Sequence, residues 1–462
     1  MFFKNAVILI FFILLNAIQT ESLSFPIYST KNLSNCTTTE EILDYFKNNK
    51  IYSFIQIGKP PKQMPIIFTS HDSISIIKKD DCPITSEYDI NFSKSINILY
   101  DELNKRYFYI KDYISFDDKN KSILMNFIHY NQTDIKEGNC GFIGIQNIEP
   151  EEKKNYNFFF QLKDMNIINK TIFYFNFSDD NNAFLNIGVE PYEINPKLYS
   201  EKNKKIIDVD YILDYERKHI DKRKYKWNLN FSQVFYFKKL PIQSSADPYS
   251  EVSRKNTRRV DFFQAMLMPE EALIKGPFEY MERIDDDFFL ELIKNNICKK
   301  INFDRKFYYV CQKEYNYLLE KTFPSLYFYS NKLNYIFELK YKDLFIEQGE
   351  YLIFGIYFNY FETELFVGAF LSEWYFGRIF LKKYCFSFDF EKGEIAFYKK
   401  NITKNKRNKK KENPKEEKNV KFYQLGLIVV VLGIGIIAFI YERMAKRKYR
   451  IDNSLIDYKL NV

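Results

Sequence analysis

The sequence predicts a mainly β fold followed by one C-terminal transmembrane helix. Short runs of aromatic and β-branched residues alternate with polar ones, and Asn, Asp and Lys fill the turns between them, which is the pattern of half-buried strands. The clearest predicted strands are Ile51–Gly58, Tyr107–Phe116, Thr171–Phe177 and Cys385–Phe390. Helical periodicity is limited, and its best examples are Glu40–Asn49, Phe158–Met165 and Asp286–Asn296.

The two ends of the chain predict entry into the secretory pathway and a membrane anchor. Residues 1–20 carry one Lys before an apolar run, which is typical of a signal peptide. Residues 422–441 are uncharged over the length that a bilayer requires, so we expect a transmembrane helix there. Residues 401–421 are a charged, low-complexity linker. A long domain behind a signal peptide is translocated, so residues 442–462 are the expected cytosolic tail of a single-pass type I protein.

Composition leaves room for a large core and argues against one class of partner. Of the 462 residues, 46% are hydrophobic, enough for two lobes or one large two-layer domain. The formal net charge of +8 is modest, and much of it lies in a short stretch near the C-terminus. No basic face with interleaved aromatic residues is legible, so we expect no nucleic-acid partner.

All six cysteines precede the predicted membrane span. They therefore lie in the part of the chain expected in an oxidising compartment, which preserves disulfides. An even number allows three bridges, and Cys298 with Cys311 is the predicted pair because the two are close in sequence and flank a predicted turn. No metal-ligand spacing such as Cys-x-x-Cys occurs and the three histidines are scattered, so we expect no metal and no other cofactor. Asn-x-Ser/Thr sequons recur and predict a glycoprotein.

Motifs of one enzyme family are spread along the chain in matching order. They lie at Gly58, Pro60, Phe68, Tyr100, Asp112, Gly141–Ile145, Phe184–Tyr192, Tyr225–Phe231 and Glu373–Phe397. Through these motifs residues 50–400 resemble the pepsin-like aspartic protease family. The resemblance implies a bilobal fold, with an N-terminal lobe at residues 21–205 and a C-terminal lobe at residues 206–400. With its predicted anchor, the layout is similar to membrane-anchored members such as plasmepsin V.

The resemblance also implies an active site of two Asp, one from each lobe, that share a proton and hold a water. Both motifs depart from the family here. Thr69 stands at the position of the first Asp, and His71 at that of the Gly two residues later. In the second motif Asp261 is the matching carboxylate, but Phe262 and Phe263 replace the residues that follow it. The Thr69 hydroxyl does not ionise near neutral pH, so it cannot replace a carboxylate.

Three functions remain open from the sequence. The favoured prediction is a homologue without peptidase activity that binds an extended peptide or a protein ligand, because fold and site are separable. Tyr100 in the flap, His71, Phe262 and Phe263 are then the predicted binding residues. Asp72 offers a shifted first Asp, which leaves an active, atypical aspartic endopeptidase as the alternative. A structural or adhesion ectodomain without peptide affinity is the third.

Overall fold

The computed structural model describes residues 22–70, 75–78, 86, 88, 93–101, 107–115, 122–130, 140–146, 155–177, 183–208, 227–237, 263–359 and 374–400. These residues belong to one compact unit, Met1–Ile402. The predicted signal peptide, linker, transmembrane helix and cytosolic tail lie outside the described residues. Within the described part of the chain, no helix has both the length and the apolar character needed to cross a membrane.

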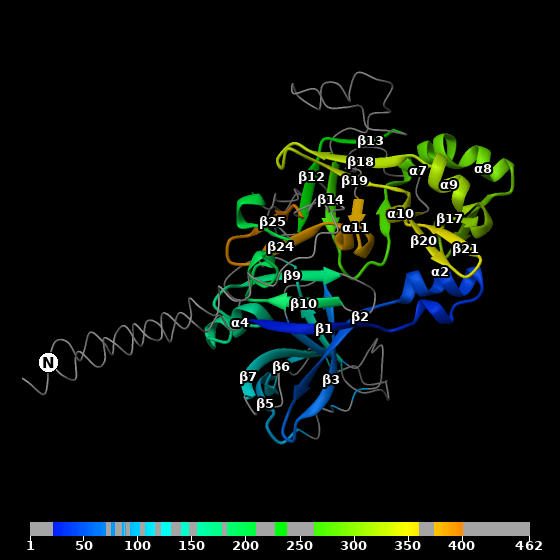
Figure 1. Ribbon diagram of the computed structural model, residues 1–462. Helices are drawn as coiled ribbons and strands as arrows, with labels where there is room; N and C mark the ends of the chain where they lie inside the picture. Colours follow the sequence, from blue (N-terminus) through cyan, green and yellow to red (C-terminus); the bar gives the residue numbers. More distant parts are fainter. Residues whose placement is uncertain are drawn as a thin grey trace, which may run out of the picture. The chain divides into compact units, whose positions relative to one another are not determined.

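The fold is mainly β, as predicted, and the described strands form three sheets (Figure 1). The largest has 13 strands in the order β11-β25-β24-β9-β10-β1-β2-β3-β8-β4-β7-β6-β5. Their bounds are β1 Leu23–Ser29, β2 Ile51–Ile57, β3 Lys62–Thr69, β4 Ser75–Lys78, β5 Asn97–Asp101, β6 Tyr107–Ser115, β7 Ser122–Tyr130, β8 Cys140–Gly144, β9 Ile172–Phe177, β10 Ala183–Ile187, β11 Lys204–Asp208, β24 Cys385–Asp389 and β25 Glu394–Tyr398.

The other two sheets come from the second half of the chain. One has nine strands in the order β12-β14-β23-β15-β22-β17-β21-β20, with β16 paired to β17, and the other is β13-β18-β19. Their bounds are β12 Asn228–Phe231, β13 Gln233–Phe237, β14 Phe263–Leu267, β15 Ile274–Gly276, β16 Cys298–Phe303, β17 Lys306–Gln312, β18 Ser325–Ser330, β19 Tyr335–Leu339, β20 Phe345–Gln348, β21 Tyr351–Phe354, β22 Ile356–Asn359 and β23 Trp374–Phe376.

Short helices occupy connections between strands. They are α2 Thr39–Asn48, α4 Phe158–Asp164, α5 Pro191–Ile194, α7 Phe278–Ile284, α8 Leu290–Lys294, α9 Asn316–Thr322, α10 Tyr341–Leu344 and α11 Arg378–Lys383, with a π-helical turn at Asp285–Phe289. The strands and helices named from the sequence are confirmed, with small shifts at their ends. The last predicted helix is divided between the π-helical turn and α8.

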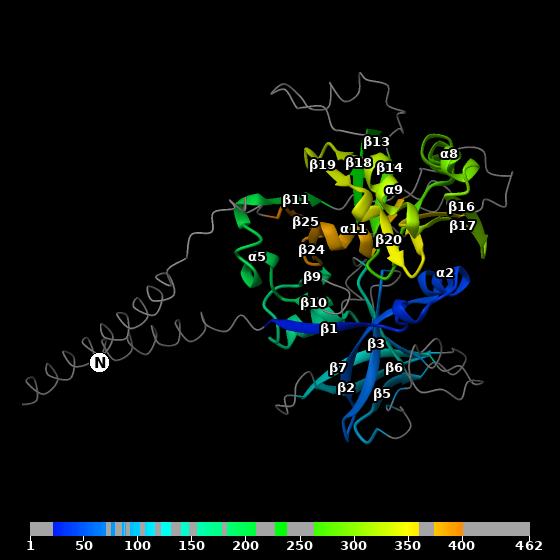
Figure 2. The same cartoon turned by 45° about the vertical axis from the view of Figure 1, so that its right-hand side comes forward.

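Strands from the beginning and the end of the described chain share one layer, which we call the middle layer: β1, β9, β10, β11, β24 and β25. Strand β9 pairs with β24 in the register Phe173–Phe388, and the two rings stack with centroids 4.8 Å apart. In Figures 1 and 2 this layer lies between a first strand group, β2–β8, and a second strand group, β12–β23. One buried hydrophobic cluster runs through all three. The predicted lobe boundary, between residues 205 and 206, falls inside β11, which pairs with β25.

A buried carboxylate ties β6 to the residues before β5. Asp112 is fully buried and accepts hydrogen bonds from Tyr88 Oη (2.9 Å), Ser93 Oγ (2.8 Å) and Ser95 Oγ. The Tyr113 backbone N–H donates a fourth bond, at 2.8 Å. Four donors offset the cost of taking the carboxylate out of water. Asp112 is therefore a structural anchor of the first strand group.

Replacing Asp112 with Ala should destabilise the protein by about 3 kcal/mol, because buried hydroxyl groups lose their shared acceptor. Urea unfolding followed by tryptophan fluorescence measures this change. The matched control is Asp164→Ala on the exposed face of α4, expected to shift stability by less than about 0.5 kcal/mol. Equal, small losses in both variants would contradict the anchoring role.

Helix α2 begins with a reciprocal cap. The Thr38 side chain accepts from the Glu41 N–H at 3.2 Å, and the Glu41 carboxylate accepts from the N–H groups of Thr37 (2.8 Å) and Thr38 (3.0 Å). These backbone hydrogen bonds lower the pKa of Glu41 from its ordinary 4.5. In the same helix, the hydrogen bond from Lys31 lowers the pKa of Asp44 from 3.8.

A depressed carboxyl pKa contributes stability that is present above the unfolded-state value and lost as the pH falls through the folded one. We therefore expect acidification below about pH 4.5 to lower the melting temperature partly through α2. The Glu41→Gln variant lacks one of these carboxylates, so its melting temperature should fall less between neutral and acid pH than that of the wild type. Parallel pH profiles for the two proteins would rule out this contribution.

Candidate functional site

Two pairs of parallel strands place the ends of β3 and β14 in matching positions. In the first strand group, β3 runs parallel to β8 and Thr69 pairs with Gly144. In the second, β14 runs parallel to β23 and Leu267 pairs with Phe376. The next residue, Met268, donates its N–H to the Phe376 carbonyl at 3.0 Å. Met268 is thus level with the glycine after Phe376, as Thr69 is level with Gly144.

Neither matching position carries a carboxylate. Thr69 is half-buried at the end of β3, and Met268 is buried. A threonine hydroxyl donates and accepts hydrogen bonds without ionising near neutral pH, and a methionine thioether is only a weak acceptor. These two side chains therefore supply neither a general base nor a proton to share.

The loops that follow these two positions are joined by a polar contact. The Ser70 backbone N–H donates to Glu270 Oε1 at 2.9 Å, and the Ser70 hydroxyl donates to the same oxygen. We call this contact the Ser70–Glu270 clasp, and it links the first strand group to the second.

Helix α11 supports the second of these loops. The Arg378 N–H donates to the Glu271 carbonyl at 2.8 Å, and Arg378 Nη1 approaches the Glu270 carbonyl at 3.4 Å. Before the helix, a Cβ added at Gly377 would lie 2.2 Å from the Leu273 carbonyl oxygen and 2.4 Å from that of Glu271. Only glycine permits this approach, since backbone atoms cannot move aside as a flexible side chain can.

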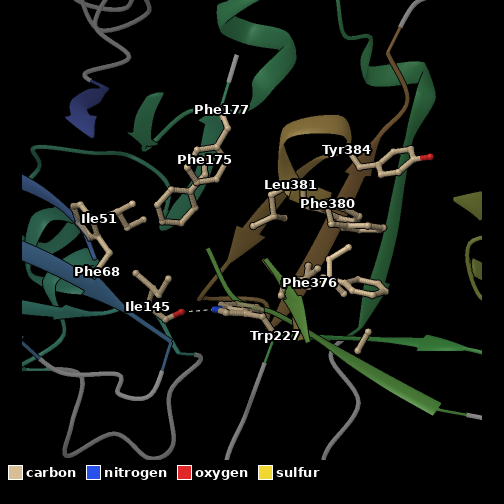
Figure 3. Close-up of a cluster of buried hydrophobic side chains, with 14 of the residues drawn as sticks. Ile51, Phe68, Ile145, Phe175, Phe177, Trp227, Phe376, Phe380, Leu381 and Tyr384 are labelled. Atoms are coloured by element: carbon tan, nitrogen blue, oxygen red, sulfur yellow. Dashed lines mark hydrogen bonds between the residues drawn. The ribbon is translucent and has the colours of Figure 1, made fainter. Parts of the chain in front are cut away.

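A tryptophan makes a second link between the strand groups. The Trp227 indole N–H donates to the Ile145 carbonyl, just after β8, and Figure 3 shows this bond among the buried side chains around it. The Trp227 ring also packs on the middle layer, with its centroid 5.2 Å from that of Phe388. This bond holds the end of β8 and the start of β12 close to two loops, the one after β3 that begins at Ser70 and the one after β14, Met268–Leu273. We call these two loops the loop pair.

The structure places only some of the predicted site residues. Tyr100 lies in β5 opposite Tyr109, and Phe263 begins β14 opposite Phe231. Thr69 ends β3 next to the clasp. The remaining predicted residues, His71, Asp72, Asp261 and Phe262, lie outside the described residues, so their roles stay predictions. Among the residues that the structure describes, no group of His, Cys, Asp and Glu side chains could hold a metal ion.

The predicted disulfide Cys298–Cys311 is confirmed and joins β16 to β17. Cys140 is also disulfide-bonded. Cys36 and Cys385 are free thiols, so the six cysteines do not form the three bridges that their number allows. Burial raises the pKa of the Cys385 thiol to about 12, which keeps it protonated and unreactive.

Sequence reasoning missed Ser70, Met268 and Glu270, which form or adjoin the observed contact between the loops. It centred the second motif on Asp261, whereas the loop that meets Ser70 follows β14. One signal was available: the apolar run Ala265–Leu267 before Met268 resembles the apolar run Ile66–Phe68 before Thr69. The charged residues before Asp261 do not share that pattern.

No protein-family model matches the chain, and no curated protein is significantly similar to it. The loop pair is therefore the basis on which a function can be proposed. Its described side chains offer hydrogen-bond donors, apolar groups and two carboxylates, of which Glu270 accepts from Ser70 and Glu271 accepts from the Tyr357 hydroxyl at 3.5 Å. Such a set can hold a ligand in place but contains no matched pair of acids.

The clasp should contribute measurably to stability. A double-mutant cycle with Ser70→Ala and Glu270→Ala should give a coupling energy of about 1–2 kcal/mol, because it isolates the hydrogen bond from the Ser70 hydroxyl to the Glu270 side chain. Chemical unfolding of the four proteins measures it. Ser200→Ala is a suitable control, since the Ser200 side chain makes no cap hydrogen bond to the 3-10 helix Glu201–Asn203 that follows it. Additive effects of the two substitutions would mean that the Ser70 hydroxyl does not stabilise the contact with Glu270.

Proposed function

We propose that the protein is a membrane-anchored homologue of pepsin-like aspartic proteases that has no peptidase activity and binds a peptide or protein through its ectodomain. The observation that carries this proposal is the pair of matching positions, Thr69 and Met268, at the ends of β3 and β14. In the family that the sequence resembles, such positions hold the two catalytic carboxylates.

The chemistry of peptide hydrolysis by this family explains why the substitutions matter. One carboxylate acts as general base on a water while the other, protonated, polarises the scissile carbonyl. Thr69 and Met268 can do neither. In the loop after β14, the Glu270 carboxylate already accepts two hydrogen bonds from Ser70. Glu271, the next residue, accepts from the Tyr357 hydroxyl at 3.5 Å. Both carboxylates come from the loop after β14, and the described part of the loop after β3 offers none to pair with them.

The arrangement of the strands supports the pepsin-like part of the proposal. The middle layer combines strands from both halves of the chain. In each strand group, one strand of a parallel pair, β3 or β14, leads into one loop of the loop pair. A two-lobed aspartic protease needs this duplication, because each lobe delivers one catalytic loop. The folded frame can persist after the chemistry is lost.

Strand β5 supports the binding part of the proposal. It is the last strand at one end of the 13-stranded sheet among the strands that the structure describes. An edge strand offers backbone N–H and C=O groups to an added chain, and main-chain hydrogen bonds of this kind bind extended peptides. Tyr100, the predicted flap residue, belongs to this strand. We therefore propose an extended peptide segment as the ligand.

The direct test is incubation of the full-length protein, in detergent, with a diverse peptide library from acid to neutral pH. We expect no cleavage, together with retention of a subset of peptides by the immobilised protein. Thermal unfolding before and after each incubation confirms that the protein stays folded.

Asp261→Ala is the control variant for the alternative enzyme. Cleavage that a pepstatin-type inhibitor blocks and that Asp261→Ala abolishes would overturn the proposal in favour of an atypical aspartic endopeptidase. A folded protein that neither cleaves nor retains any peptide would leave the structural or adhesion ectodomain as the better account.

A further inference from the structure

Helix α2 belongs to the first part of the chain but packs on the second. It connects β1 to β2, yet Ile42, Leu43 and Phe46 are buried in one cluster with residues of the second strand group. In both views the helix lies next to β20 (Figures 1 and 2). Its partners in the cluster are Ala272, Leu273, Tyr308, Val310, Ile353 and Tyr357.

Polar contacts reinforce this docking at both ends of the helix. Near its C-terminus, Lys47 Nζ lies 2.7 Å from Asp304 Oδ2, in the turn between β16 and β17. Before its N-terminus, Gln348 Nε2 of β20 donates to the Cys36 carbonyl at 2.9 Å. The whole segment from Cys36 to Asn48 is thus attached to the second strand group.

Two residues of this cluster belong to the loop of the candidate site. Ala272 and Leu273 directly follow Glu270, which the Ser70 clasp holds, and Glu271. The loop Met268–Leu273 is therefore linked to the first part of the chain twice: by the hydrogen bonds at Glu270, and through the buried apolar cluster that Ala272 and Leu273 share with α2. Both originate far from it in sequence.

We propose that α2 is a strap that positions the loop Met268–Leu273 against the loop after β3. A ten-residue helix is too short to be stable by itself in water, so α2 stays helical only while it is docked. Undocking thus removes the helix and the apolar support of the loop together. The inference goes beyond the proposed function, since the strap acts in the same way whether or not a peptide binds.

The pattern of hydrogen-exchange protection distinguishes a strap from a helix that only adds to the core. Losing part of such a helix lowers protection against hydrogen exchange throughout the unit. Losing the strap lowers protection mainly in α2 and in the loop that it positions. Hydrogen exchange by mass spectrometry on the full-length protein separates the two, because it reports each segment independently.

The test variant is Leu43→Ala and its matched control is Leu162→Ala in α4, since both leucines are fully buried. We expect Leu43→Ala to speed exchange in peptides that cover Met268–Leu273 by at least about tenfold, through local opening. Leu162→Ala should leave those peptides unchanged. Leu43→Met, which conserves volume, should restore most of the protection. Faster exchange confined to α2, or spread equally over the unit, would overturn the proposal.

A milder pair of variants covers the case in which Leu43→Ala fails to fold. Lys47→Glu places like charges together at Asp304 and should speed exchange in the same loop peptides about twofold. The control Lys342→Glu breaks a different surface pair, Lys342–Glu320 at 2.9 Å, and should leave the loop unchanged. Identical loop exchange in Lys47→Glu and the wild type would count against the strap.

Discussion

The pairing of β9 with β24 is the constraint on which the rest of the structure depends. It joins a strand from the first half of the chain to one near its end, and the stacked rings of Phe173 and Phe388 fill the layer at that point. Trp227 packs against Phe388 and donates to the Ile145 carbonyl. Once these strands share a layer, the two strand groups approach each other, and the loops after β3 and β14 come into contact.

The residues that the fold requires around the loop pair differ from those that aspartic protease chemistry would require. Close backbone approach demands glycine at Gly377, because any Cβ there would collide with carbonyl oxygens. Thr69 and Met268 face no such demand, since the strand ends are held by backbone hydrogen bonds to β8 and β23. The backbone pairing therefore sets no residue type at these two positions.

Several independent contacts hold the loop Met268–Leu273 in place. Glu270 accepts hydrogen bonds from Ser70, and the backbone carbonyls of Glu270 and Glu271 accept hydrogen bonds from Arg378. The next two residues are buried in the cluster that includes α2. Ordering a loop costs conformational entropy, and several independent contacts are needed to offset it. A preorganised surface of this kind suits binding, because less entropy remains to be lost when a ligand arrives.

The sequence by itself determined the local structure. Alternating aromatic residues predict β2 and β24, helical spacing predicts α2 and α4, and proximity predicts Cys298–Cys311, because each depends on neighbours along the chain. The partners of these elements were decided only in the tertiary structure. Met268 matches Thr69 because β14 runs parallel to β23, and α2 docks on the second strand group. Such long-range pairings leave no periodic pattern in the sequence, so they could be seen only in the folded chain.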